Sequence, residues 1–346
     1  MINFDDIEEI KKIDSKNAVG STDLLPEQLK KAWEEVDKLQ IQKISGIKNI
    51  VFCGMGASIY GALVLKALYG YDLSYPMETI SDYHLPKYVA NTTLIVLTSY
   101  SGTTEEVLSC ANEAKEKKCQ MLILTQGGPL GEFAKKNNIP SYIFDGKLNP
   151  CGVPRYGNGY TVIGLLALLR KAGVIDIDEE KILSAIDKIS QRKNDLRLRA
   201  KEDAKAYIKK VPVIFAAEHL SGNAQIMRNQ FNETSKTFSA FYLIPDLNHH
   251  LMEGLAFPKN SNLLFLLLDS NNYSLKIQSR VKLTREVVLK NNQKVYDYKT
   301  SGASKIEDFL EIMVYGAYLT LFLGLLHGED PAPNPWVDYF KDQLKK

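Results

Sequence analysis

Residues 48–68 read KNIVFCGMGASIYGALVLKAL, and residues 211–231 repeat their layout as VPVIFAAEHLSGNAQIMRNQF. Each stretch begins with a short apolar run of strand type, passes through a small turn and continues with helical spacing. A further buried strand is predicted at 262–269, NLLFLLLD. Few residues are identical between the two stretches. The common order of strand, turn and helix therefore carries the prediction that one α/β unit is duplicated within the chain.

Apolar runs alternate with helix-like segments through the first half of the chain. Five runs are predicted as strands, at 49–54, 76–80, 93–102, 120–125 and 141–146. Strands that alternate with helices favour a mainly parallel sheet with helices on both faces. The predicted fold class is therefore α/β, with one mainly parallel sheet in each half of the chain.

The same pattern predicts the domain organisation. An amphipathic helix at 22–45 leads into the first unit, and the apolar run from Ile312 to Leu326 is predicted as a buried helix because it is too short for a membrane span. The predicted segments are a helical lead-in at 1–45, a first domain at 46–150, a helical connector at 151–210, a second domain at 211–330, and a C-terminal tail and helix at 331–346.

Composition and charge favour a soluble protein that binds a small ligand. Of 346 residues 45% are hydrophobic, and 43 Lys and Arg against 41 Asp and Glu give a net charge of +2, which is too small for nucleic-acid binding. The acidic start MINFDDIEEIKK does not resemble a signal segment, so we expect a cytoplasmic protein without a membrane partner. Four scattered cysteines predict buried thiols and no metal site.

The segment LTSYSGTTEE at 97–106 places hydroxyl side chains between a predicted strand and a predicted helix. Free N–H groups and a partial positive charge at a helix start can hold a phosphate without a lysine. The alternative is that these side chains only cap the helix. The candidate phosphate ligands, with a glycine between them that permits an unusual turn, are Ser99, Ser101, Thr103 and Thr104.

A second loop of the same kind, CGMGASIYG at 53–61, approaches the same edge of the sheet, and Gly56 and Ser58 are its candidate ligands. It is not a dinucleotide fingerprint, because Ile59 stands where the third glycine belongs, and no lysine completes a P-loop. A G-x-G-x-S loop, an S-x-S-G-x-T loop and a related second half resemble sugar isomerase (SIS) domains, which have a flavodoxin-like fold. The resemblance implies that these side chains bind a sugar phosphate.

Aldose–ketose isomerisation moves a proton between C1 and C2 through an enediol, without a metal or redox cofactor. It needs a base, a cation for the developing oxyanion and an acid/base pair that opens the sugar ring. The sequence offers Glu233 in QFNETSK, His249 in PDLNHH and Arg155 in CGVPRYG. The alternatives are a solvated carboxylate, a structural histidine and a surface charge.

These segments also resemble the bifunctional phosphoglucose/phosphomannose isomerase family. N-E-x-x-K stands at 232–236, which makes Glu233 the implied base, and PDLNHH makes His249 the implied ring-opening residue. The family's V-P-R ends at Arg155, and the ending EDPAPNPWVDYFKDQLKK makes Lys341 the implied partner in ring opening. The resemblance implies a homodimer in which the histidine of one subunit completes the site of the other.

Two positions depart from the family pattern. His250 replaces an Asn, and Asn334 stands where bifunctional members tend to carry a small hydroxyl residue. Interconversion of glucose 6-phosphate with fructose 6-phosphate is the expected activity, and mannose 6-phosphate is left open as a further substrate. The alternatives are a non-catalytic sugar-phosphate sensor, an isomerase for another sugar phosphate, and the isomerase half of a glucosamine 6-phosphate amidotransferase. The last requires a glutaminase domain that begins with a cysteine, and Ile2 follows Met1 here.

Overall fold

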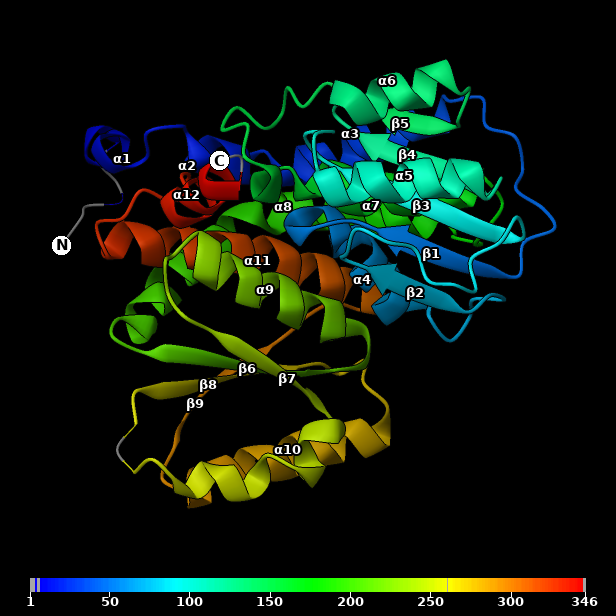
Figure 1. Cartoon of the computed structure of the whole chain (residues 1–346). Helices are drawn as coiled ribbons and strands as arrows, with labels where there is room; N and C mark the ends of the chain where they lie inside the picture. The colour runs from blue at the N-terminus through cyan, green and yellow to red at the C-terminus, as the bar shows by residue number, and fades with distance from the viewer. Residues whose placement is uncertain (1–3, 5–6, 260, 345–346) are drawn as a thin grey trace.

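The computed structural model describes residue 4, residues 7–259 and residues 261–344. Two parallel sheets, one from each half of the chain, lie on opposite sides of a central layer of helices (Figure 1). The predicted α/β class with two mainly parallel sheets is confirmed. The separate sheets support the domain boundaries drawn from the sequence, which remain a proposal.

The first sheet has the strand order β2-β1-β3-β4-β5, and all its neighbouring strands are parallel. Every residue of β3 is buried, as expected for a central strand with helices on both faces. The strands are β1 Asn49–Cys53, β2 Met77–Ile80, β3 Thr93–Ser99, β4 Gln120–Thr125 and β5 Ser141–Ile143. The helices that connect and cover them are α4 Tyr60–Tyr69, α5 Glu105–Glu116, α6 Gly128–Lys136 and α7 Asn158–Lys171.

The second sheet has the order β7-β6-β8-β9, which matches β2-β1-β3-β4 of the first. The predicted strands at 211–217 and 262–269 are β6 and β8, whereas β7 and β9 did not stand out as apolar runs. The strands are β6 Val211–Ala217, β7 Ala240–Ile244, β8 Leu263–Asp269 and β9 Lys294–Lys299. The main helices are α9 Ser221–Glu233, α10 Leu275–Lys290 and α11 Lys305–Leu326.

The remaining elements flank these halves. The helices are α1 Ile7–Ile13, α2 Ala18–Asp23, α3 Leu25–Asp37, α8 Glu179–Asp203 and α12 Pro335–Leu344. The short 3₁₀ turns are η1 Gly56–Ile59, η2 Pro154–Tyr156, η3 Ala204–Tyr207, η4 Glu218–Leu220, η5 Asp246–His249 and η6 Met252–Ala256. Helix α3 packs on α7, and the long helix α8 packs on α11.

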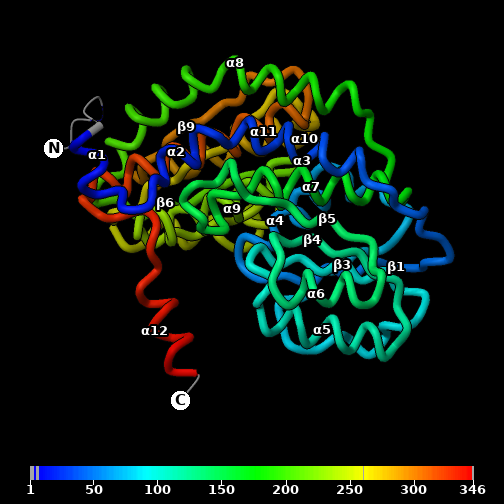
Figure 2. Tube along the Cα trace, turned by 90° about the horizontal axis from the view of Figure 1, so that it is seen from above, coloured from blue at the N-terminus to red at the C-terminus, as the bar shows by residue number. Residues whose placement is uncertain are grey.

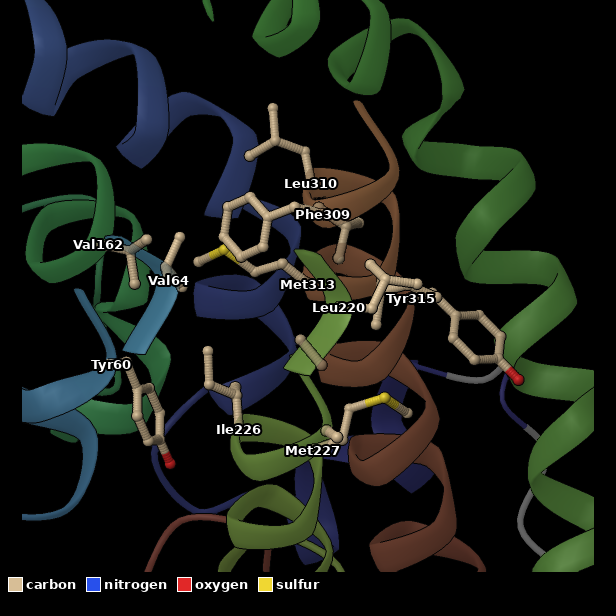
Figure 3. Packing of buried hydrophobic residues seen from close by; sticks show 14 of the residues in the cluster. Tyr60, Val64, Val162, Leu220, Ile226, Met227, Phe309, Leu310, Met313 and Tyr315 are labelled. Atoms are coloured by element: carbon tan, nitrogen blue, oxygen red, sulfur yellow. The ribbon is translucent and has the colours of Figure 1, made fainter. Parts of the chain in front are cut away.

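Helices α4, α9 and α11 join the two halves through buried apolar side chains (Figure 3). Helix α11 begins at Lys305, before the predicted apolar run, and with 22 residues it has the length and composition of a membrane span, so the length argument from the sequence was wrong. The prediction of a buried helix is confirmed, because 94% of its most apolar stretch is buried inside the protein. The four cysteines are also buried and free, as predicted.

Helix α12 leaves the body of the molecule, as Figure 2 shows, and none of its described residues is buried. It nevertheless carries large apolar side chains, with Trp336 82% exposed and Phe340 62% exposed. Because such side chains are rarely left in water, this helix has the composition of a surface that packs against a partner.

Candidate active site

The loop that follows β3 carries its four hydroxyl side chains in two pairs. Ser99 Oγ lies 2.8 Å from Thr104 Oγ1, and Ser101 Oγ lies 2.8 Å from Thr103 Oγ1. Gly102, at φ 72°, turns the chain and donates its N–H to Ser99 Oγ at 3.0 Å. Ser99 is buried, whereas Ser101 and Thr103 are exposed. The first pair therefore holds the loop together, and the second faces solvent.

The start of α5 is open to an anion. Thr104 is its N-cap residue, and the Thr104 side chain makes no capping hydrogen bond. The N–H groups of the first turn are thus left without the usual side-chain acceptor, next to two exposed hydroxyls. This geometry favours phosphate binding over the alternative that the hydroxyl side chains only cap the helix. Glu105 and Glu106 in the first turn of α5 also interact favourably with the positive end of the helix dipole.

The loop after β1 lies beside this helix start because β1 and β3 are neighbouring parallel strands. Ser58 is buried, and its Oγ accepts a hydrogen bond from the N–H of Tyr100 at 3.0 Å, which ties the two loops together. Gly56, at φ 55°, is exposed, and a Cβ placed there would meet nothing within 4 Å. Gly56 therefore leaves open space, and Ser58 shapes the loops. We call the residues Gly56, Ser58, Ser99, Ser101, Thr103 and Thr104 the cradle.

Glu233 is the last residue of α9 and is neither fully buried nor freely solvated. Its carboxylate Oε2 accepts a hydrogen bond from Asn334 Nδ2 at 3.1 Å and lies 3.6 Å from Arg155 Nη1. The Glu233 side chain is 32% exposed and that of Arg155 only 2%. A carboxylate held by a buried cation and an amide is unlike the solvated surface carboxylate that the sequence left as the alternative.

Arg155 is buried, which excludes the surface charge that its loop position suggested. Its Nε donates to Thr234 Oγ1 at 3.1 Å, and its Nη2 donates to the carbonyl oxygens of Pro331 and Ala332. In the part of the chain that the structure describes, its Nη1 has no hydrogen-bond partner. The side chain thus joins three distant segments and keeps one donor directed at Glu233.

Lys236 completes the N-E-x-x-K motif by folding back on the end of α9. The residue has a φ of 53°, and its Nζ donates to the carbonyl oxygens of Glu233 and Pro333, both at 2.6 Å. Burial, followed by the charge of Arg155, lowers the pKa of Lys236 to about 8. No separate role for Lys236 was predicted from the sequence, because a lysine after a helix usually lies in solvent.

Tyr60 is a further polar residue near this site that the sequence pattern presented only as part of an apolar helix. It is fully buried at the start of α4, and within the described residues its hydroxyl has no hydrogen-bond partner. In Figure 3 the hydroxyl points away from the labelled apolar side chains. Burial first, and the charge of Glu233 second, raise the pKa of Tyr60.

A cavity of about 430 Å³ opens beside Glu233, between the end of α9 and the edge strand β7. Arg228 lines it, and the Nε atom of this side chain is buried without a hydrogen-bond partner among the described residues. The guanidinium also lies 5.3 Å from the ring of Phe241. The space beside the carboxylate thus has both polar and aromatic lining and is large enough for part of a sugar.

Comparison with known proteins identifies the family. Over 340 residues the chain is 31% identical to a bifunctional phosphoglucose/phosphomannose isomerase of Caldicellulosiruptor bescii, which covers 92% of this chain and 96% of that protein. The chain belongs to this bifunctional isomerase family. A protein of the same description from Aquifex aeolicus is 29% identical over 91% of this chain and 94% of its own length.

Two further comparisons concern the second half of the chain and the fold. Residues 197–344 match the family described as bacterial phospho-glucose isomerase C-terminal SIS domain, which together with the bifunctional relatives confirms the SIS resemblance. A solved structure of a hypothetical protein from Thermus thermophilus shares the fold of this isomerase, with a TM-score of 0.74 and 17% identity over 95% of this chain and 90% of that chain.

Two residues that the family pattern implies for ring opening make no hydrogen bond or ion pair with Glu233 in the part of this isomerase that the structure describes. His249 is exposed in η5, after the end of β7, whereas Glu233 precedes that strand. A five-residue strand alone spans roughly 17 Å. Lys341 lies on α12, the helix that projects from the body (Figure 2). The site within one chain therefore consists of the cradle and the cluster of Glu233, Arg155 and Lys236.

The two departures from the family pattern differ in their surroundings. Asn334 contacts Glu233 directly. His250 is exposed, and its Nε2 lies 3.3 Å from Asp246 Oδ2 on the same turn. The substitution at 334 is thus the one that the geometry connects to the choice of sugar.

Proposed function

We propose that this isomerase interconverts glucose 6-phosphate and fructose 6-phosphate by proton transfer through an enediol, with mannose 6-phosphate as a second aldose substrate. The observation that supports this most strongly is the position of the Glu233 carboxylate between Arg155, Asn334 and the Lys236 turn. A base next to buried cations is the arrangement that enediol chemistry requires.

Glu233 carries the proton between the two carbons. It takes the proton from C2 of the open-chain aldose, and electrons move into the C1 carbonyl to give an enediolate with its negative charge on O1. The proton of the O2 hydroxyl passes to O1, and Glu233 returns its proton to C1 as the carbonyl forms at C2. Arg155, whose Nη1 has no hydrogen-bond partner within the described chain, and Lys236 stabilise the negative oxygen that develops between these steps.

The cradle binds the 6-phosphate. Ser101 and Thr103 present exposed hydroxyls, and Thr104 leaves the first turn of α5 open. The buried members, Ser58 and Ser99, act by fixing the loops through their hydrogen bonds. Binding at a helix start requires no metal, and the positive end of the dipole complements the phosphate charge.

The working unit is a homodimer in which His249 of the partner subunit and Lys341 open the sugar ring. Three observations support this assembly: the exposed His249 makes no hydrogen bond or ion pair with Glu233 in the described chain, α12 exposes large apolar side chains, and Phe238 beside the cavity is 72% exposed. Burial of such surfaces is the usual driving force for association. Four buried free cysteines fit a reducing compartment, so we place the dimer in the cytoplasm.

A coupled assay of the purified protein with fructose 6-phosphate tests the function, with glucose 6-phosphate and mannose 6-phosphate measured separately. We expect glucose 6-phosphate to form, and mannose 6-phosphate to form alongside it. Binding of fructose 6-phosphate without either product, at any concentration of enzyme, would instead identify a sugar-phosphate sensor and contradict the proposal.

A further inference from the structure

The two halves of the chain can be aligned residue by residue through their strand pairing. In the first half Cys53 of β1 pairs with Leu97 of β3, and in the second Phe215 of β6 pairs with Leu267 of β8. Three residues beyond Cys53 and Phe215 lie Gly56 and Glu218. Seven residues beyond Leu97 and Leu267 lie Thr104 and Ser274. These two pairs are therefore structurally equivalent.

The backbone at the first of these pairs is alike. Gly56 has a φ of 55° and Glu218 a φ of 40°, and each begins a 3₁₀ turn that leads into a helix. Residues other than glycine rarely adopt such a φ. The two halves therefore have the same turn. The second half carries Glu218 at the position where the first half has Gly56 of the cradle.

The Glu218 side chain reaches the helix start that corresponds to the phosphate site. Its Oε2 accepts a hydrogen bond from the N–H of Ser274 at 3.1 Å, and its Oε1 accepts one from Ser274 Oγ at 2.6 Å. Ser274 is the N-cap residue of α10, and its own side chain does not cap that helix. A carboxylate thus occupies the start of α10 as a bound anion would.

The equivalent place in the first half has no such group. Gly56 has no side chain, a Cβ there would meet nothing within 4 Å, and Thr104 does not cap α5. We propose that Glu218 is an internal anion that closes the second half to phosphate, so that each chain binds one sugar phosphate, in the first half. This inference rests on the proposed function, because it takes the cradle to be the phosphate site.

Substitution of Glu218 tests this with inorganic phosphate as the probe, counted per chain by equilibrium dialysis. We expect one phosphate per chain for the wild type and two for Glu218→Gly, which also suits the positive φ. Glu218→Gln keeps the side chain in place and should bind one. The proposal would be overturned if Glu218→Gly still bound only one phosphate per chain, or if Glu218→Gln bound a second phosphate as well. Isomerase activity should remain in both variants.

A second pair of variants separates this proposal from the proposed function. Ser101→Ala with Thr103→Ala should remove the phosphate of the first half, and adding Glu218→Gly to that background should restore one phosphate per chain. If the double variant still binds phosphate and the wild type has no isomerase activity, the proposed function fails. Whether Glu218→Gly adds a phosphate still decides the role of Glu218.

The reverse substitution avoids any dependence on how the second half folds. Gly56→Glu places a carboxylate at the start of α5, with the same turn that Glu218 already tolerates. We expect the KM for fructose 6-phosphate to rise at least tenfold. Gly46→Glu is the matched control, because Gly46 also has a positive φ, at 70°, and open space around it. An unchanged KM in Gly56→Glu would contradict the proposal.

Discussion

Asn334 Nδ2 donates a hydrogen bond to Glu233 Oε2 at 3.1 Å, across 101 positions of the chain. The short segment before Asn334 also holds the two cations, because the carbonyl oxygens of Pro331 and Ala332 accept from Arg155 and that of Pro333 accepts from Lys236. Residues 331–334 therefore line the cluster of Glu233, Arg155 and Lys236. Their sequence bears on which face of the sugar Glu233 can reach.

Replacing Asn334 with Ser tests whether this segment influences the choice of sugar. The change removes the amide donor to Glu233 and supplies the small hydroxyl that bifunctional members tend to carry. We expect the ratio of mannose 6-phosphate to glucose 6-phosphate formed from fructose 6-phosphate to rise on the order of tenfold, the scale of one hydrogen bond to a charged group. Asn271→Ser, on an exposed turn, is the control. An unchanged product ratio would show that Asn334 does not influence the choice of sugar.

Removing two hydroxyls of the cradle tests its part in phosphate binding. In Ser101→Ala with Thr103→Ala, the KM for fructose 6-phosphate should rise by roughly 100-fold, because two hydrogen bonds to a charged group are lost. The melting temperature should change little, since both side chains are exposed. Ser45→Ala, at an exposed site before β1, should alter neither quantity. A normal KM in the double variant would refute the assignment.

The pKa of Lys236, lowered to about 8 mainly by burial, predicts a pH dependence. The lysine is positively charged below that pH and neutral above it, so its help to the enediolate is present at low pH and is lost as the pH rises through about 8. We expect kcat to fall across this range in the wild type. In Lys236→Met, kcat should be lower at pH 7, and this alkaline fall should be absent. An unchanged alkaline fall in the variant would assign it to another group.

Mixed dimers test whether a site is built from two subunits. Glu233→Gln chains and His249→Ala chains should each be nearly inactive alone. In a dimer that contains one of each, one site keeps both wild-type residues. Random reassociation of equal amounts should therefore restore about a quarter of wild-type activity. If the mixture stays inactive, or if the wild type is a fully active monomer by light scattering, the shared site is wrong.

Much of the fold followed from local pattern. The buried strands β1, β3, β4, β6 and β8 stood out because helices cover both faces of a parallel sheet and leave nearly continuous apolar runs. Edge strands carry less of this signal. Strand β9 reads KVYDYK, with exposed charges at both ends, and β7 has only one buried residue. Both were therefore missed from the sequence.

The candidate site was predictable only in part. The cradle consists of two short loops, each formed by neighbouring residues at the end of one strand, so both loops and the start of α5 were visible in the sequence. The contact of Glu233 with Asn334 and Arg155 depends on the packing of α9 against distant segments, and no local spacing encodes it. The family resemblance supplied these residues. The orphaned hydroxyl of Tyr60 had no sequence signal, because a tyrosine at the start of an apolar helix is usually part of the core.

Glu233→Gln tests whether Glu233 is the base, because it keeps the shape of the side chain and removes its capacity to accept a proton. The measurement compares kcat with Kd for fructose 6-phosphate and follows exchange of the C1 and C2 hydrogens with solvent. We predict that kcat falls by on the order of 10² to 10⁴, that Kd is nearly unchanged and that exchange is lost. Wild-type exchange in the variant would contradict it and show that Glu233 is not the base.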